Sequence, residues 1–145
     1  MAERQVIDRQ RLIADVISMI DTPYHHQGRD ENGLDCVGLI IAALRRQGID
    51  PQAPADYGKS PPGNSLLKHI DQCGLFQQVH VGQRQPGDML VFVIRSDPQH
   101  LGLLVERPAG GPEIMVHSAD VIMRVRAATL GEAWLKRIAA VYRPN

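Results

Sequence analysis

Residues 33–48 read GLDCVGLIIAALRRQG and decide the fold, because a long apolar run follows a single aspartate. Asp35 is a good helix N-cap, since a carboxylate oxygen accepts hydrogen bonds from the free N–H groups at the start of a helix. The run that begins at Cys36 is apolar on most faces of a helix, and Gly48 is a candidate for its C-terminal stop. The stretch therefore predicts a buried central helix with a cysteine in its first turn.

Two further helices are predicted on either side of this central helix. Apolar residues recur at helical spacings from about Asp8 to Ile20, which indicates an amphipathic helix that ends before Pro23. A short helix is expected around residues 66–70, closed by Gly74. Residues 51–63 are rich in proline and glycine, so an irregular surface loop is expected there.

The second half of the chain changes to the pattern of β-strands. Its apolar, partly β-branched runs are short and are separated by turn residues. Five strands are predicted in this way: Met89–Ile94, Leu101–Val105, Ile114–His117, Val121–Val125 and Ile138–Tyr142. Helices followed by strands indicate an α+β domain, with N-terminal helices packed on an antiparallel meander of about five strands. We expect residues 1–145 to form a single domain, because no boundary interrupts the chain.

The composition excludes several classes of function. The chain has 145 residues, of which 43% are hydrophobic, and its 16 basic and 16 acidic side chains cancel. A neutral chain has no long-range positive field, so neither nucleic acid nor an anionic membrane surface is an expected partner. No run approaches about 18 apolar residues, which argues against membrane insertion, and the polar N-terminus does not resemble a signal peptide. We therefore expect synthesis in the cytoplasm without a signal peptide.

Reactive side chains are concentrated at Cys36, His100 and His117. With Cys73 as the only other cysteine, the chain has too few thiols for a disulfide scaffold or a four-thiolate zinc site. A cysteine at a helix N-terminus beside an imidazolium has a lowered pKa, which makes its thiolate a nucleophile. Asp35 opposes this effect unless its carboxylate is occupied in capping the helix. If the strands that carry the two histidines are neighbours, His117 is placed to orient the ring of His100.

The residue types alone leave other interpretations open. A single cysteine in an apolar helix is most often an inert core residue, and a single histidine at a strand end is most often solvated. One cysteine with two histidines is also compatible with a zinc site, although no fourth ligand has an obvious spacing. Cys73, His69 and His80 stand in no comparable pattern and are expected to be incidental, while Trp134 is expected to be a core or interface anchor.

Four blocks of sequence favour catalysis over these alternatives. The first block, TPYHHQG at 22–28 followed by GLDCVGLI at 33–40, is similar to the cysteine motif of the NlpC/P60 peptidases. The segments PGDMLVF at 86–92, HLGLL at 100–104 and MVHSA at 115–119 resemble the later blocks of that family in the same order. Together the blocks span most of the chain.

The resemblance implies a papain-like α+β fold and hydrolysis of peptide bonds in bacterial cell-wall peptidoglycan, with neither a cofactor nor a metal. It also implies that Cys36 is the nucleophile, that His100 is the general base and then acid, and that His117 orients His100. The expected groups for the oxyanion are the backbone N–H of Cys36 and the hydroxyl of Tyr24. Packing of the loop against the helix is an equal alternative for Tyr24. Asp35 adjoins this site and is counted among the expected oxyanion and substrate-binding residues.

The blocks depart from the pattern of most secreted members of the family at two places. Val37 replaces the usual serine, and His25-His26-Gln27 replace the commoner aromatic-Gly-Gly pattern. His25 and His26 are counted among the expected substrate-binding residues that line the cleft, with loop histidines that face solvent as the alternative. The two departures resemble the branch encoded by phages and gene transfer agents, which implies phage-tail or tail-like particle proteins as partners and action on the cell wall. Two alternatives to a peptidase remain. One is a related thiol amidase or acyl transferase, and the other is a tail-assembly protein that keeps the fold without hydrolysis.

Overall fold

The computed structural model describes residues 6–51 and 61–145, so most of the expected loop at 51–63 lies outside the described residues. The helices of this part of the chain are α1 (Arg9–Ser18), α2 (Cys36–Arg46), α3 (Ser65–Cys73) and α4 (Glu132–Leu135), with short 3-10 helices η1 (Val81–Gln83) and η2 (Asp120–Ile122). The strands are β1 (Arg29–Asp30), β2 (Gly33–Leu34), β3 (Phe76–Val79), β4 (Met89–Ile94), β5 (Asp97–Val105), β6 (Ile114–Ser118), β7 (Val125–Thr129) and β8 (Ile138–Pro144). The predicted α+β class is confirmed.

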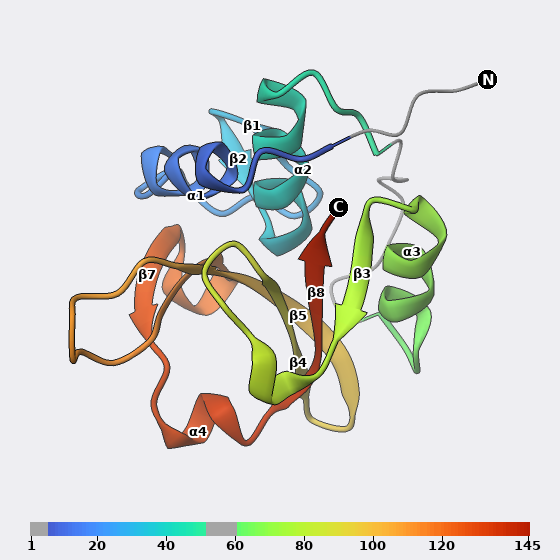
Figure 1. Ribbon diagram of the computed structural model, residues 1–145. Coiled ribbons are helices and arrows are strands. Elements are labelled where there is room, and N and C mark those ends of the chain that lie inside the picture. The colour runs from blue at the N-terminus through green and yellow to red at the C-terminus, as the bar shows by residue number, and fades with distance from the viewer. Residues whose placement is uncertain (1–5, 52–60) are drawn as a thin grey trace.

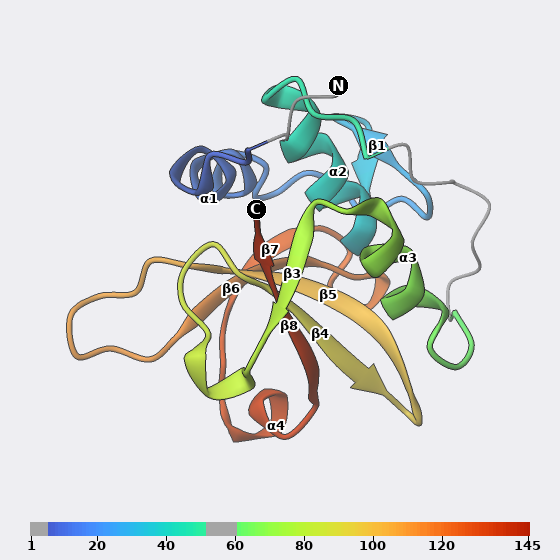
Figure 2. The same cartoon turned by 45° about the vertical axis from the view of Figure 1, so that its right-hand side comes forward.

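The larger sheet has the strand order β3-β8-β4-β5-β6-β7, and each neighbouring pair is antiparallel. α1 and α2 lie together over one side of it, α4 lies on the opposite side, and α3 lies beside β3 (Figure 1 and Figure 2). The expected meander is wrong at one point, because β8 returns between β3 and β4 instead of continuing from β7. The apolar residues of β8 account for this position, since a central strand is covered on both faces.

The start of α2 is fixed by Asp35, as the sequence predicts. Asp35 Oδ1 accepts a hydrogen bond from the Gly38 N–H at 2.6 Å, which satisfies one of the N–H groups that a helix start leaves free. The helix ends at Arg46, and Gly48 follows with a φ of 78°, a left-handed conformation that glycine adopts readily. The third predicted helix is also confirmed, and Gly74 closes it with a φ of 73°.

The central strands are buried on both faces, which is why they appear in the sequence as continuous apolar runs. One cluster fills the space between the sheet, α1 and α2, and its fully buried members include Leu12, Leu39 and Leu103. A smaller cluster lies on the other face, around Phe92 and Val141, with Trp134 of α4 packed against it. Burying one such side chain contributes roughly 1.5–3 kcal/mol, so these contacts hold α2 and α4 on their respective faces.

Two segments of the sheet differ from the prediction. The expected strand Val121–Val125 is wrong, because residues 120–122 form η2 and the Val121 side chain is 86% exposed. The chain turns at Met123, which has a φ of 64°, and the strand β7 begins only at Val125. The edge strand β3 is absent from the prediction because it is short, and its residues are exposed or half-buried instead of forming an apolar run.

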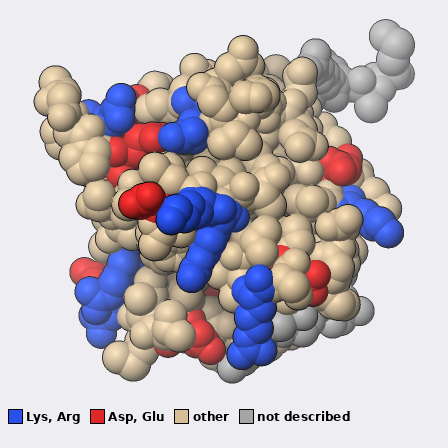
Figure 3. Space-filling model, turned by 90° about the horizontal axis from the view of Figure 1, so that it is seen from below, with Lys and Arg blue, Asp and Glu red and all other residues tan. Residues whose placement is uncertain are grey.

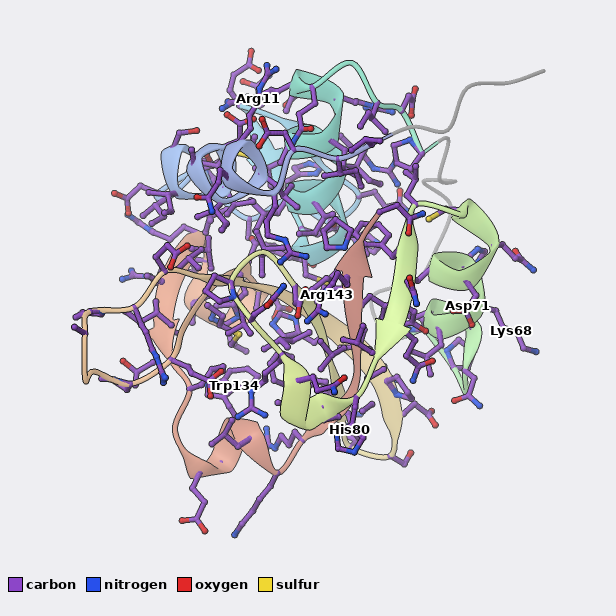
Figure 4. All side chains as sticks on the ribbon, in the orientation of Figure 1. Arg11, Lys68, Asp71, His80, Trp134 and Arg143 are labelled. Atoms are coloured by element: carbon purple, nitrogen blue, oxygen red, sulfur yellow. The ribbon has the colours of Figure 1, made fainter. Side chains whose placement is uncertain are left out.

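The PGD block forms the turn that begins β4. Gly87 has a φ of 92°, and a side chain there would collide with Arg9. Asp88 is fully buried, and it accepts hydrogen bonds from Arg143 Nε at 3.1 Å, Arg143 Nη2 at 2.9 Å and the Gln85 N–H at 2.9 Å. A buried carboxylate needs such partners because an unpaired buried charge is costly. The pair ties the start of β4 to β8, where Arg143 lies (Figure 4).

Within residues 6–51 and 61–145, none of the helices combines the length and the apolar character needed to cross a membrane. On the face seen in Figure 3, basic and acidic side chains are interspersed and do not gather into a large area of one sign. This face therefore offers no continuous positive surface for a polyanion.

Candidate active site

A cavity of about 480 Å³ opens where the N-terminus of α2 meets β5 and β6. Its size is in the range of sites that bind small molecules or short peptide segments. The wall brings together most of the residues singled out from the sequence, namely Tyr24, His26, Asp35, Cys36, Val37, His100 and His117. The rest of the wall comes from the residues around α3, the strands β4, β5 and β6, the 3-10 helix η2 and the residues in and after α4. These are Pro61, Leu66, Ile94, Gln99, Ser118, Ala119, Asp120, Val121, Ile122, Trp134 and Arg137.

Cys36 is the first residue of α2, and its half-buried side chain lines the cavity. Burial raises the pKa of its thiol to about 12, and the neighbouring Asp35 carboxylate adds to this effect. The backbone N–H groups of Leu101, Val37 and Cys36 itself lower the pKa, because they stabilise the thiolate, but their effect is smaller. The resting thiol is therefore protonated, which corrects the expectation that the helix start gives Cys36 a lowered pKa.

His100 and His117 lie on β5 and β6, which pair directly, as expected. His100 Nε2 and His117 Nδ1 are 2.8 Å apart, so one nitrogen donates a hydrogen bond to the other. Both side chains are buried, and burial lowers the pKa of His117 to about 4. Burial, followed by the proximity of His117, lowers the pKa of His100 to about 3. Both rings are therefore neutral at pH 7, so no imidazolium stands beside the resting thiol.

Asp35 is buried and joins the loop before α2 to the helix itself. Its Oδ1 accepts a hydrogen bond from the Gly38 N–H at 2.6 Å, and its Oδ2 accepts one from the Gln27 N–H at 2.8 Å. Both carboxylate oxygens are thus engaged by backbone groups. The condition that Asp35 be occupied in capping is met, although its charge still raises the pKa of Cys36.

Three glycines allow the loop of residues 22–34 to lie directly on the start of α2. A Cβ added at Gly38 would lie 1.8 Å from the Gly28 carbonyl oxygen, and one added at Gly28 would lie 2.3 Å from the Gly33 carbonyl oxygen. No side chain fits at these distances, so the glycines of the first block are required by close backbone packing. They fix the position of the loop relative to the thiol.

Tyr24 and His26 line the cavity, whereas His25 does not. Burial raises the pKa of the Tyr24 phenol to about 12, and the charges of Asp35 and Asp120 add to the shift, so the hydroxyl keeps its proton. His25 is exposed, and its Nδ1 lies 2.9 Å from the His26 carbonyl oxygen. The structure thus brings His26, but not His25, to the cleft that both were expected to line.

Trp134 of α4 covers the two histidines, a role that no spacing in the sequence indicates. The centre of its ring lies 5.8 Å from that of His100, with 29° between the planes, and 5.4 Å from that of His117. Figure 4 shows the side chain pointing from α4 toward the sheet. The expected core anchor therefore packs directly on the imidazole pair and shields it from water.

Ser118 is a second contact that the sequence pattern does not reveal. Its buried hydroxyl donates a hydrogen bond to the Leu34 carbonyl oxygen at 2.7 Å. Since Ser118 follows His117 and Leu34 stands two residues before Cys36, this bond joins the histidine strand to the segment that leads into Cys36. It connects parts of the chain that are 84 residues apart.

The other thiol and the remaining histidines lie outside this cavity. Cys73 is half-buried at the end of α3, and its Sγ donates to the Ile70 carbonyl oxygen at 3.1 Å. Across residues 6–51 and 61–145, no group of three or more His, Cys, Asp or Glu side chains is arranged to hold a metal ion. The zinc alternative therefore gains no support from this part of the chain.

The fold and the cavity define an α+β domain in which a cysteine at a helix start shares a cleft with a histidine pair. The family model of the NlpC/P60 family matches residues 21–143, so the chain belongs to that family. A search of curated proteins gives no significant match.

Solved structures agree with this assignment at the level of the fold. An NlpC/P60 family protein from Bacillus cereus superposes with a TM-score of 0.68 at 19% identity over 97% of this chain, which spans only 41% of that protein. The peptidoglycan hydrolase RipB from Mycobacterium tuberculosis superposes with a TM-score of 0.61 at 18% identity. The match covers 93% of this chain and 63% of the RipB chain. RipD from the same organism is described as a non-catalytic NlpC/p60 domain protein adapted to peptidoglycan binding. It superposes with a TM-score of 0.59 at 16% identity, and the match covers 97% of this chain and 98% of the RipD chain.

Proposed function

We propose that this protein is a cysteine peptidase that hydrolyses peptide bonds in the stem peptides of bacterial cell-wall peptidoglycan. The proposal rests on one observation: Cys36 and the hydrogen-bonded pair His100 and His117 line the same cavity. A thiol, a base and a group that orients the base are the parts that acyl transfer to sulfur requires. Membership of the NlpC/P60 family and the fold shared with the peptidoglycan hydrolase RipB support the substrate class.

In this proposal His100 is the general base. Its Nε2 is engaged with His117 Nδ1, which leaves His100 Nδ1 to accept the thiol proton. For Nδ1 to be free, the ring proton of His100 must sit on Nε2 and be donated to His117 Nδ1. This hydrogen bond fixes the tautomer of both rings, so His117 acts as a positioning residue.

Because the resting thiol and both rings are neutral, proton transfer accompanies the attack on the substrate. The sulfur of Cys36 bonds to the carbonyl carbon while its proton passes to His100. The resulting oxyanion accepts hydrogen bonds from the backbone N–H of Cys36 and from the Tyr24 hydroxyl. The raised pKa of Tyr24 suits this role, since it keeps the donor proton on the phenol oxygen.

The second half of the reaction returns the enzyme to its starting state. His100 gives the proton to the leaving amine, the carbon–nitrogen bond breaks, and a thioester remains on Cys36. A water molecule, deprotonated by His100, then attacks the thioester and releases a carboxylic acid together with the thiol. An amine in place of water would make the same site an acyl transferase, which is the related alternative.

Digestion of purified peptidoglycan, with products identified by mass spectrometry, tests the proposal. We expect stem-peptide cleavage by the wild type and none by Cys36→Ala, with circular dichroism showing that the variant is folded. Cys73→Ser is the matched control, because Cys73 lies outside the cavity, and it should cleave like the wild type. Equal products from wild type and Cys36→Ala would reject the proposal. Binding without cleavage by the wild type would favour a role like that described for RipD.

We further propose that the protein acts from within a phage tail or a gene transfer particle. Support comes from the sequence at the cleft, where Val37 and His26 belong to the two departures from the secreted pattern and both line the cavity. Quantitative mass spectrometry of particles purified from producing cells is the test. The protein should copurify with tail proteins at a constant ratio, and its presence only in the cell fraction would contradict this location.

A further inference from the structure

Two charged side chains of the cavity wall do not touch the reacting atoms in the proposed chemistry, although the charge of one of them, Asp120, adds to the raised pKa of Tyr24. Arg137 and Asp120 both line the cavity and are exposed. The third charged group of the wall, Asp35, has both oxygens engaged by backbone N–H groups. A substrate in this cavity therefore meets one available cation and one available anion among the described residues of the wall.

Arg137 combines a fixed backbone with an unpaired guanidinium. Its N–H donates to the Trp134 carbonyl oxygen at 2.9 Å, and its own carbonyl accepts from the Val93 N–H at 2.8 Å. Its guanidinium forms no ion pair with any residue that the structure describes, whereas the adjacent Lys136 pairs with Glu132 at 3.6 Å. The guanidinium therefore remains available to a carboxylate on a ligand.

Arg137 and Asp120 lie on opposite sides of His100 in the order of the sheet. Arg137 directly precedes Ile138 of β8, which pairs with Phe92 of β4, and Phe92 pairs with His100 of β5. Asp120 follows β6, the strand next to β5 on the other side. Three strand spacings of roughly 4.8 Å separate the two positions by about 14 Å, which about four residues of an extended peptide would span.

We propose that the cavity selects a peptide with a carboxylate for Arg137 and an ammonium group for Asp120, one on each side of the bond that Cys36 attacks. This inference rests on the proposed function and names the feature of the peptide that the site recognises. A guanidinium binds a carboxylate through two parallel charge-assisted hydrogen bonds, and a carboxylate such as Asp120 accepts from an ammonium group. The two charges also set the direction in which the peptide lies across the cleft.

Kinetics on synthetic stem tetrapeptides test the inference. The wild type should show a kcat/KM about 10- to 100-fold higher for the peptide with a free carboxylate than for its amidated analogue. Arg137→Gln should bring this ratio close to one, while Lys136→Gln, the neighbouring cation outside the cavity, should keep it. Asp120→Asn should likewise abolish the preference for a free amine over an acetylated one.

An equal loss of kcat/KM on both peptides in Arg137→Gln would overturn the inference, because it would mean that Arg137 supports the fold alone. If the wild type cleaves neither peptide, the proposed peptidase function fails, and calorimetric titration of Cys36→Ala with the same peptides decides the recognition separately. A dissociation constant at least about tenfold lower for the carboxylate peptide, lost in Cys36→Ala/Arg137→Gln, supports the inference. Equal dissociation constants for the two peptides overturn it.

Discussion

The thiol and the histidines of the cavity occupy regions that are built in different ways. Cys36 is positioned by residues close to it in sequence, because Asp35 caps its helix and Gly28 and Gly38 bring the preceding loop into backbone contact. His100 and His117 are 17 residues apart and meet at 2.8 Å because β5 and β6 pair. The loop side, which carries Cys36, therefore depends on glycines that have no side chain. The sheet side, which carries the two histidines, depends on strand register and on the contacts that hold the strands together.

The two regions share one electrostatic property. Burial raises the pKa of Cys36 and lowers the pKa of both histidines, so each region favours the uncharged form of its reactive groups. Under the proposed mechanism, a site assembled from two neutral halves would transfer its proton during the reaction and not before it.

The largest effect is expected on the loop side, from Gly38→Ala. The new Cβ would lie 1.8 Å from the Gly28 carbonyl oxygen, so the loop must move. We expect the free energy of unfolding, measured with urea, to fall by about 3 kcal/mol, and hydrolysis to be lost with the displaced loop. Gly131→Ala is the control, since its Cβ would meet nothing within 4 Å. Unchanged stability in Gly38→Ala would show that the loop and α2 are not in this contact.

On the sheet side, Asp88→Asn should lower the free energy of unfolding by about 2 kcal/mol, because it weakens the buried bonds to Arg143. Asp88 does not line the cavity, so kcat/KM measured well below the unfolding temperature should stay near the wild-type value. Glu132→Gln, which removes an exposed ion pair with Lys136, is the control and should change stability little. A large loss of kcat/KM in folded Asp88→Asn would contradict the claim that Asp88 stabilises the strands without acting on the site.

The histidine pair should make stability depend on pH. The folded-state pKa values of about 3 for His100 and about 4 for His117 lie below the ordinary 6.5. Below pH 6.5 these histidines therefore bind protons in the unfolded chain but not in the folded chain. Stability should therefore fall as the pH drops from 6.5 to 4, by up to about 1.4 kcal/mol per pH unit for each histidine. Urea unfolding at pH 7, 6 and 5 measures the slope. His100→Asn/His117→Asn should flatten it, and an unchanged slope would refute the assignment.

The smallest effect concerns the thiol alone. In a Cys73→Ser background, the rate at which iodoacetamide alkylates Cys36 should rise about tenfold per pH unit between pH 6 and 9, because its raised pKa leaves little thiolate. A rate that levels off below pH 8 would instead indicate a thiolate already present in the resting protein. That result would restore the expectation of an activated cysteine. The two regions would then differ in charge, with an anionic thiolate on the loop side and neutral histidines on the sheet side.

Local patterns predict some elements well and others not at all. α2 and its Asp35 cap follow from an apolar run behind an N-cap residue, and β4 occupies the predicted residues Met89–Ile94. The strand expected at Val121–Val125 fails because apolar residues there turn outward at a 3-10 helix. A run of apolar residues indicates burial only when tertiary contacts cover it, and periodicity does not report those contacts.

The sequence by itself determined the α+β class, the helix that begins at Cys36 and the pattern of blocks that marks the NlpC/P60 family. These features depend on hydrogen bonds and steric limits within a few residues, such as the Asp35 cap. Tertiary structure alone decided the place of β8 in the sheet, the stacking of Trp134 on the histidines and the neutral state of the thiol. The physical reason is that strand order, ring contacts and desolvation depend on groups distant in sequence, which only the folded chain brings together.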